Sequence, residues 1–226
     1  WQNQPNAISV QEVLEDALSK LLKTKITIVG AGRTDAGVHA EQLFAHFDYD
    51  EEFNIEKLIF KLNSFLPKDI SIQNIYKVKE DAHARFDALS RTYNYVITQK
   101  KDVFNSEGSC YVKHDLDISK MNEAAKILFD YRNFKCFSRS NTDVKTYNCV
   151  IMFAKWKKVN SQLIFTIKAD RFLRNMVRAI VGTMLEIGLG KTSIEDFYEI
   201  IKSEDRTKAG ASVPAHGLYL SKIEYP

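Results

Sequence analysis

The feature that most constrains the fold is an irregular alternation of capped amphipathic helices and short strands. Ser9 and Glu12 form a capping box that opens one helix, and Asn54 and Ser193 stand at the starts of two others. The strands between them lack the regular βαβ spacing of a doubly wound parallel sheet. We therefore predict an α+β fold with mainly antiparallel sheets flanked by helices.

The predicted elements follow from hydrophobic periodicity and turn residues. The predicted helices cover residues 9–22, 54–66, 118–129, 171–187 and 193–202. The predicted strands cover residues 25–29, 42–49, 70–78, 92–98, 150–159, 163–169 and 217–225. A polar run near residues 78–83 has few packing side chains, so we predict an N-terminal α+β domain over 1–80 and a C-terminal α+β domain over 81–226.

Composition limits the class of protein and its compartment. Hydrophobic residues make up 45% and charged residues 27% of the 226 residues, as in ordinary globular domains. No apolar run approaches the roughly 18–20 residues of a membrane span, and the first residues do not form a signal peptide. Three scattered cysteines suit a reducing compartment, so we expect a cytoplasmic protein. The chain starts at Trp1 rather than Met, so we expect residues to precede it.

The net charge of +3 is compatible with a nucleic-acid partner but does not establish one. The five histidines and three cysteines lack the spacing of a metal site, so we expect no bound metal.

The segment GAGRTDAGVHA, residues 30–40, carries the most unusual chemistry. It follows a predicted strand, and its glycines permit tight turns and close approach to a ligand. Arg33 and Asp35 stand among those glycines, where a loop can present a catalytic carboxylate. A tight turn with Asp35 bonded to its own backbone is an equal alternative.

Two further segments carry positive charge. Arg171, Arg174 and Arg178 share one face of the predicted helix over 171–187. Cations at a helix start oppose the macrodipole, which favours an anionic partner, although a solvated basic face is the common alternative. In ARFDALSRTYNYVI, residues 84–97, basic groups alternate with Tyr93 and Tyr95, a pattern that suits RNA. For Tyr95 we favour a role in the core.

Together these segments resemble the tRNA pseudouridine synthase A family. GRTDAGVHA (32–40), ARFDALSRTY (84–93) and FLRNMVRAIVG (172–182) are similar to three motifs of that family. Both ends of the chain also look like the family's, so the resemblance spans nearly the whole sequence. The family usually begins with a strand and a Tyr-Asp-Gly-Thr segment ahead of the position of Trp1.

The resemblance implies an isomerase that converts uridine to pseudouridine at positions 38, 39 and 40 of the tRNA anticodon arm. It implies a homodimer that contacts one tRNA with both subunits, and no metal or organic cofactor. It also implies two ferredoxin-like halves with mainly antiparallel sheets and an active-site cleft between them.

The resemblance and the chemistry together assign roles to residues. Asp35 is expected to be the catalytic carboxylate, Arg178 to pair with it, and Tyr93 to contact the target base. Arg33 is expected to contact a backbone phosphate or to help flip the base. The weaker candidates for RNA contact are Arg171, Arg174, His39 and Arg91.

Two other function classes stay open. A non-catalytic RNA-binding module would explain the basic and aromatic residues, but not a carboxylate inside a Gly-rich turn. A glycosidase or nucleoside hydrolase would need a second positioned carboxylate, and no comparable loop of the sequence carries one.

Overall fold

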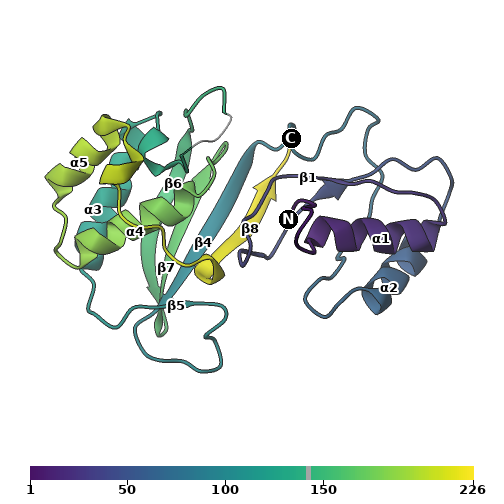
Figure 1. Ribbon diagram of the computed structural model, residues 1–226, viewed down its shortest axis with the longest axis horizontal. Helices are drawn as coiled ribbons and strands as arrows, with labels where there is room; N and C mark the ends of the chain where they lie inside the picture. The colour runs from purple at the N-terminus through teal and green to yellow at the C-terminus, as the bar shows by residue number, and fades with distance from the viewer. Residues whose placement is uncertain (141–143) are drawn as a thin grey trace. The chain divides into compact units, whose positions relative to one another are not determined.

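The computed structural model describes residues 1–140 and 144–226, which form two compact units (Figure 1). The first unit contains Trp1–Thr34 and Leu43–Ala88, and the second contains Asp35–Gln42 and Leu89–Pro226. The short segment Asp35–Gln42 therefore packs with the C-terminal part of the chain. The predicted division into domains at residue 80 stays a prediction.

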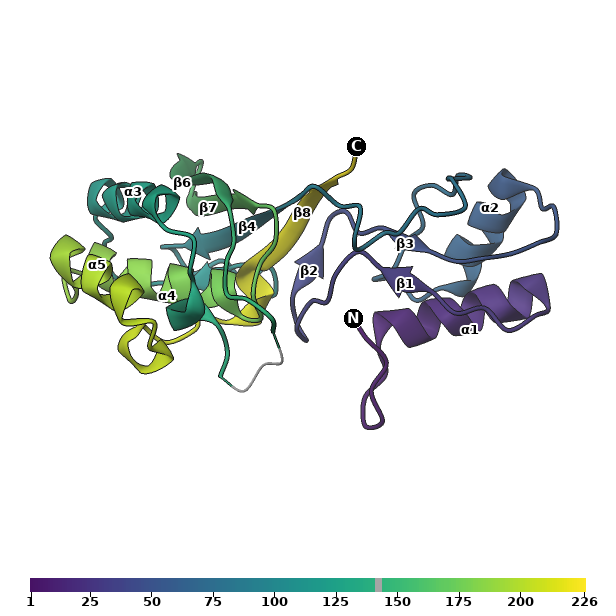
Figure 2. The same ribbon diagram turned by 90° about the horizontal axis from the view of Figure 1, so that it is seen from above.

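The first unit is built on two helices and a small sheet. Helix α1 (Val10–Leu22) packs against α2 (Ile55–Phe65), and β1 (Val29–Gly30) pairs antiparallel with β3 (Ala45–His46) (Figure 2). Its core consists of Leu14, Ala17, Leu18, Ile26, Ile28, Leu58, Leu62 and Leu66.

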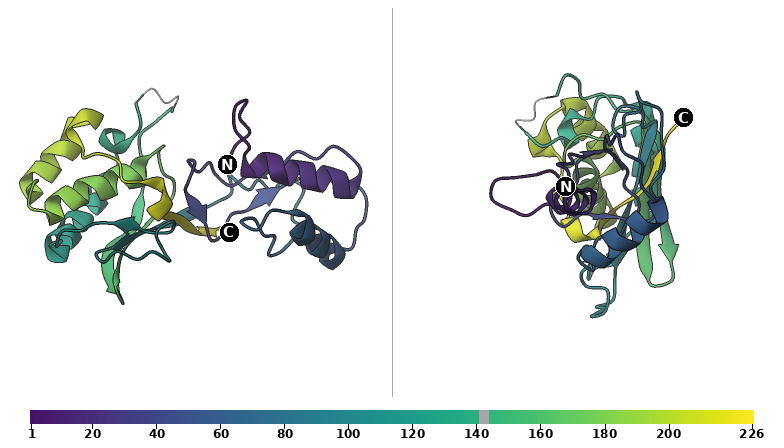
Figure 3. Two further views of the ribbon diagram at one scale, coloured as in Figure 1. Left: turned by 60° about the horizontal axis from the view of Figure 1, so that its bottom comes forward. Right: turned by 90° about the vertical axis from the view of Figure 1, so that its right-hand side faces the viewer.

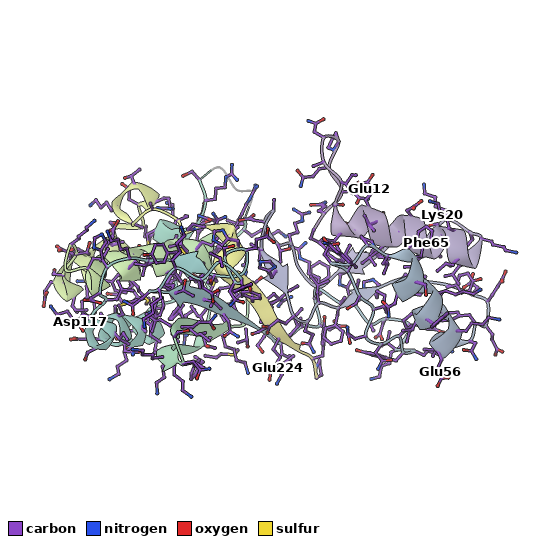
Figure 4. The ribbon with its side chains drawn as sticks, turned by 90° about the horizontal axis from the view of Figure 1, so that it is seen from below. Glu12, Lys20, Glu56, Phe65, Asp117 and Glu224 are labelled. Carbon is purple, nitrogen blue, oxygen red and sulfur yellow. The ribbon has the colours of Figure 1, made fainter. Side chains whose placement is uncertain are left out.

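The predicted helix starts of this unit are confirmed. Ser9 and Glu12 form both bonds of the capping box, and the Asn54 side chain accepts from the Lys57 N–H. Glu12 marks the first turn of α1 in Figure 4, and further along that helix the Lys20 ammonium lies 5.3 Å from the Phe65 ring centroid.

The strands predicted in the first unit are too long or do not form. Helix side chains take the backbone bonds that a neighbouring strand would take. Glu15 accepts from the Ile28 N–H at 3.0 Å, and Gln11 donates to the Ile28 carbonyl at 3.0 Å. The Asn63 amide bonds both backbone groups of Ile72, so no strand ladder forms over 70–78 among the described residues.

The second unit is built on a six-stranded sheet. Its strands are β2 (His39–Ala40), β4 (Ser90–Thr98), β5 (Cys110–Tyr111), β6 (Ile151–Val159), β7 (Gln162–Ala169) and β8 (Leu218–Glu224). The strand order is β2-β8-β4-β7-β6, with β5 also paired to β4. The long pairings of β4 with β7 and β8, and of β6 with β7, are antiparallel, whereas the short β2–β8 and β4–β5 pairings are parallel. The predicted α+β class with a mainly antiparallel sheet is confirmed.

Three helices cover one face of this sheet (Figures 2 and 3). They are α3 (Ile118–Ile127), α4 (Met176–Gly188) and α5 (Ile194–Ser203). Single 3-10 turns η1 (Leu128–Asp130), η2 (Lys135–Phe137), η3 (Arg206–Lys208) and η4 (Ala215–Gly217) complete the layer. Between the layers, the fully buried ring of Trp156 stacks on Phe165 at 4.8 Å.

Helix α4 begins later than predicted. The residue before it, Asn175, has φ of +67°, a left-handed conformation that a right-handed helix cannot continue. Arg171 and Arg174 therefore lie in the preceding loop, and of the three predicted arginines Arg178 alone belongs to the helix. The predicted single helical face of three arginines is wrong for this reason. None of the described helices is long and apolar enough to cross a membrane.

Candidate active site

The Asp35 loop is held by the sheet of the second unit. Its turn is closed by a 3.2 Å bond from the Val38 N–H to the Asp35 carbonyl, with Gly37 at φ of +78°. Immediately after this turn, β2 pairs with β8 through His39 and Tyr219. The positive φ favours glycine at position 37, so the Gly-rich sequence serves a tight turn directly beside the carboxylate.

The Asp35 carboxylate faces two arginines. Its Oδ2 lies 3.3 Å from an Arg178 terminal nitrogen, and its Oδ1 lies 4.0 Å from the Arg174 Nε. About a third of the Asp35 side chain is exposed (33%), against 21% for Arg178 and 57% for Arg174. Within the described residues, the side chain does not bond its own turn, so the structure favours the first of the two interpretations of this loop.

These groups line an open pocket of about 750 Å³. Its lining residues are Asp35, Arg139, Ser140, Arg174, Asn175, Arg178 and Arg206. Four arginines and a single carboxylate line the pocket, and this excess of positive charge suits an anionic ligand. Planar guanidinium groups match phosphate oxygens in particular.

Sequence reasoning missed Arg139 and Arg206. Arg139 follows η2 and Arg206 opens η3, and neither stands in a segment whose local pattern indicates a site. Tertiary contacts connect each of them to the residues just before α4. The Arg139 N–H bonds the Arg174 carbonyl at 3.0 Å, and Arg206 bonds Ser212, whose hydroxyl also accepts from Asn175.

Tyr93 is not among the residues that line this pocket, but the charge of Asp35 acts on its hydroxyl. Tyr93 lies half-buried on β4, with its ring edge-on to Phe172 at 5.2 Å. Burial raises the pKa of Tyr93 to about 12, and the negative charge of Asp35 adds to this rise, while Arg91 opposes it. No described residue bonds the hydroxyl, so it is available to a ligand.

The second tyrosine of that strand has a different role. Tyr95 is fully buried, and its hydroxyl donates to the Pro214 carbonyl at 2.9 Å. Its predicted place in the core is confirmed.

Three of the remaining candidates for RNA contact make contacts within the protein. Arg91 donates to the Asp170 carbonyl at 2.9 Å, and Arg171 to the Thr146 carbonyl at 3.5 Å. His39 stacks on Tyr219 at 4.7 Å. Arg33 is exposed in the first unit. Their contacts with RNA stay predictions, and within residues 1–140 and 144–226 no group of His, Cys, Asp or Glu is arranged to hold a metal.

The fold and this pocket define a class: an α+β protein whose site holds one carboxylate among arginines and suits an anionic ligand. Residues 1–87 and 124–226 match the family described as tRNA pseudouridine synthase. Proteins named tRNA pseudouridine synthase A are 54% identical in Parabacteroides distasonis and 53% identical in Bacteroides fragilis, covering all of this chain and 90% of each relative. A protein of that name from Thermoanaerobacter sp. is 40% identical over the whole chain and 93% of the relative. The chain belongs to the tRNA pseudouridine synthase family.

Proposed function

We propose that this chain isomerises uridine to pseudouridine at positions 38, 39 and 40 of tRNA, with Asp35 as the catalytic carboxylate. Family membership supports the reaction and the tRNA substrate. The observation that carries the residue assignment is the Asp35 carboxylate 3.3 Å from Arg178 in an arginine-lined pocket.

The chemistry explains why a single carboxylate suffices. The reaction breaks the bond between C1′ and N1, turns the uracil and joins C5 to C1′. H5 leaves to solvent and N1 gains a proton, so the composition of the RNA does not change. Loss of the base develops positive charge on the ribose, which a carboxylate stabilises. Asp35 has two routes, addition to C1′ or removal of the C2′ proton.

The other groups bind and orient the nucleotide. Extrusion of uridine from the stack costs a few kcal/mol. Stacking of the base on Tyr93 returns about 1–3 kcal/mol. We expect the Tyr93 hydroxyl to assist the proton transfer when H5 leaves. Arg174 and Arg178 line the pocket as partners for phosphate and for Asp35, whereas Arg33, Arg171, His39 and Arg91 are proposed as outer contacts with tRNA.

The proposal extends to assembly, domains and compartment. We propose a homodimer that binds one tRNA with both subunits, two domains divided in the sequence at residue 80, and a cytoplasmic location. The resemblance of the sequence supports the homodimer and the two halves, and the polar run near residues 78–83 supports the boundary. The three free, buried cysteines support a reducing compartment.

The test is release of tritium from tRNA labelled at C5 of uridine. Asp35→Asn should lower the single-turnover rate by at least about 1000-fold, because the amide cannot supply the charge or the nucleophile. The Kd for tRNA should stay within about three-fold, because phosphate contacts dominate affinity.

Asp81→Asn, at an exposed carboxylate outside the pocket lining, is the matched control. Turnover by Asp35→Asn near the wild-type rate would refute the assignment. Binding without tritium release by the wild-type protein would favour the RNA-binding module, and release of free uracil would favour a hydrolase.

A further inference from the structure

Residues 209–213, here called the strap, lie directly against helix α4. A Cβ placed on Gly182 would stand 1.8 Å from the Ala211 carbonyl oxygen, so the helix has no room for a side chain there. The Gly210 N–H donates to the Thr183 hydroxyl at 2.9 Å. Gly182 of α4 and Gly210 of the strap thus allow the two backbones to lie in close contact.

The last residue of the strap, Val213, bonds Arg178. The Arg178 Nε donates to the Val213 carbonyl at 2.7 Å, and the Val213 N–H donates to the Arg178 carbonyl at 3.2 Å. The guanidinium is planar, so a bond that fixes Nε also fixes the direction of the two terminal nitrogens. One of these nitrogens faces Asp35. The position of the Val213 carbonyl therefore orients the Arg178 guanidinium toward Asp35.

The strap is anchored by Arg206. This half-buried side chain donates to the Ala209 and Gly210 carbonyls, both at 3.2 Å, and to the Ser212 hydroxyl at 2.9 Å. Ser212 also accepts from the Asn175 side chain, next to the start of α4. A single guanidinium thus bonds three of the five strap residues, and Ser212 ties the strap to the residue before the helix.

We propose that Arg206 is a positioning residue, which holds the strap so that Val213 aims Arg178 at Asp35. The inference rests on the proposed catalytic role of Asp35. Arg206 has a planar fork of donors that reaches three acceptors, whereas the ammonium of a lysine is a point donor on a flexible stem. Arg206 bonds two backbone oxygens and one hydroxyl oxygen of the strap. Its effect on the reaction is therefore indirect, through the orientation of Arg178.

The first test separates rate from binding. Arg206→Ala should lower the single-turnover isomerisation rate on the order of 10–100-fold, because small displacements of reacting groups cost that much. The Kd for tRNA should change less than about three-fold. Arg206→Lys should recover little of the rate. Lys208→Ala, which removes an exposed charge from the same 3-10 turn, should match the wild type.

The second test is a double-mutant cycle with Arg178→Ala. Because Arg206 acts through Arg178, Arg206→Ala should cause no further loss of rate in the Arg178→Ala background. Additive losses would overturn the proposal. A raised Kd with an unchanged rate would also overturn it, because Arg206 would then be a contact for tRNA.

A milder variant covers the case in which Arg206→Ala does not fold. Ser212→Ala removes the acceptor shared by Arg206 and Asn175 and should show a smaller loss of rate with the same lack of additivity. Thermal unfolding of each variant reports its folding. If Asp35→Asn stays active, the proposed function fails. If Asp35 is essential but the Ser212 and Arg178 effects add, the positioning role alone fails.

Discussion

At the scale of single residues, the hydroxyl of Tyr93 is the group whose protonation bears most directly on the chemistry. Its pKa of about 12 means that it is a neutral donor at every working pH. Tyr93→Phe keeps the ring for stacking but removes this donor. We expect the isomerisation rate to fall by about 100-fold, the scale of a lost proton-transfer group, with an unchanged Kd for tRNA.

The measurement is single-turnover tritium release at saturating enzyme. Tyr131→Phe, at a half-buried ring outside the pocket lining, is the control and should keep the wild-type rate. Equal rates for Tyr93→Phe and the wild type would limit Tyr93 to packing and stacking.

Some residues of the candidate site could be predicted from the sequence, and others could not. The Gly-rich loop singled out Asp35, whereas the pairing of Arg178 with Asp35 was implied by the family resemblance. The structure brings the two side chains within 3.3 Å. Arg206 stands in an ordinary polar turn. Its contribution depends on where the strap lies, and no spacing along the chain encodes that.

At the scale of elements, the contact between α4 and the strap makes Gly182 critical. A methyl group at this position would displace the Ala211 carbonyl, a backbone atom that cannot rotate away. We expect Gly182→Ala to lower the free energy of unfolding by about 1–3 kcal/mol, the usual cost of overpacking. It should also slow isomerisation, because the strap aims Arg178.

Urea unfolding measures the first effect. Gly32→Ala is the control, since its added methyl meets no atom within 4 Å and should leave stability near the wild-type value. A Gly182→Ala protein as stable as the wild type would contradict the close packing of strap and helix.

Elements were predictable where a local signal and the tertiary packing agree. The capping boxes at Ser9 and Ser193 lie where the sequence predicts helix starts. The turn at Asn160 lies between the two strands predicted over 150–159 and 163–169. The strand predicted over 70–78 fails because Asn63 bonds the backbone of Ile72, and apolar alternation does not report such a partner. The start of α4 was missed because the left-handed φ of Asn175 leaves no mark in the hydrophobic pattern.

At the scale of the whole molecule, the fold class follows from pattern, whereas the pairing of distant segments does not. The sequence predicts a mainly antiparallel α+β fold because its strands are short and irregularly spaced. It does not indicate that β2 pairs with β8, because His39 and its partner Tyr219 are far apart in the sequence. That parallel pairing brings the Asp35 loop to the sheet that also carries Tyr93.

Glu224, the last residue of β8, is expected to make the stability of the fold depend on pH. Glu224, labelled in Figure 4, accepts hydrogen bonds from three side chains. The donors are Lys168 of β7, Ser90 of β4 at 2.6 Å and Lys222 at 2.9 Å. Hydrogen bonds from Lys168, Ser90 and Lys222 lower the pKa of Glu224 from 4.5 to about 2. A lowered folded-state pKa means that the unfolded chain binds the proton first. The stabilisation is therefore complete above about pH 4.5 and is lost as the pH falls toward 2.

Glu224→Gln should remove this dependence. The variant should be less stable than the wild type at pH 7, and the two urea midpoints should converge as the pH falls from 4.5 to 2. Glu123→Gln, at an exposed carboxylate on α3, should follow the wild type at every pH. A constant difference between Glu224→Gln and the wild type across this range would show that the three donors do not stabilise the charged form. The contact of Glu224 with its neighbours would then be packing alone.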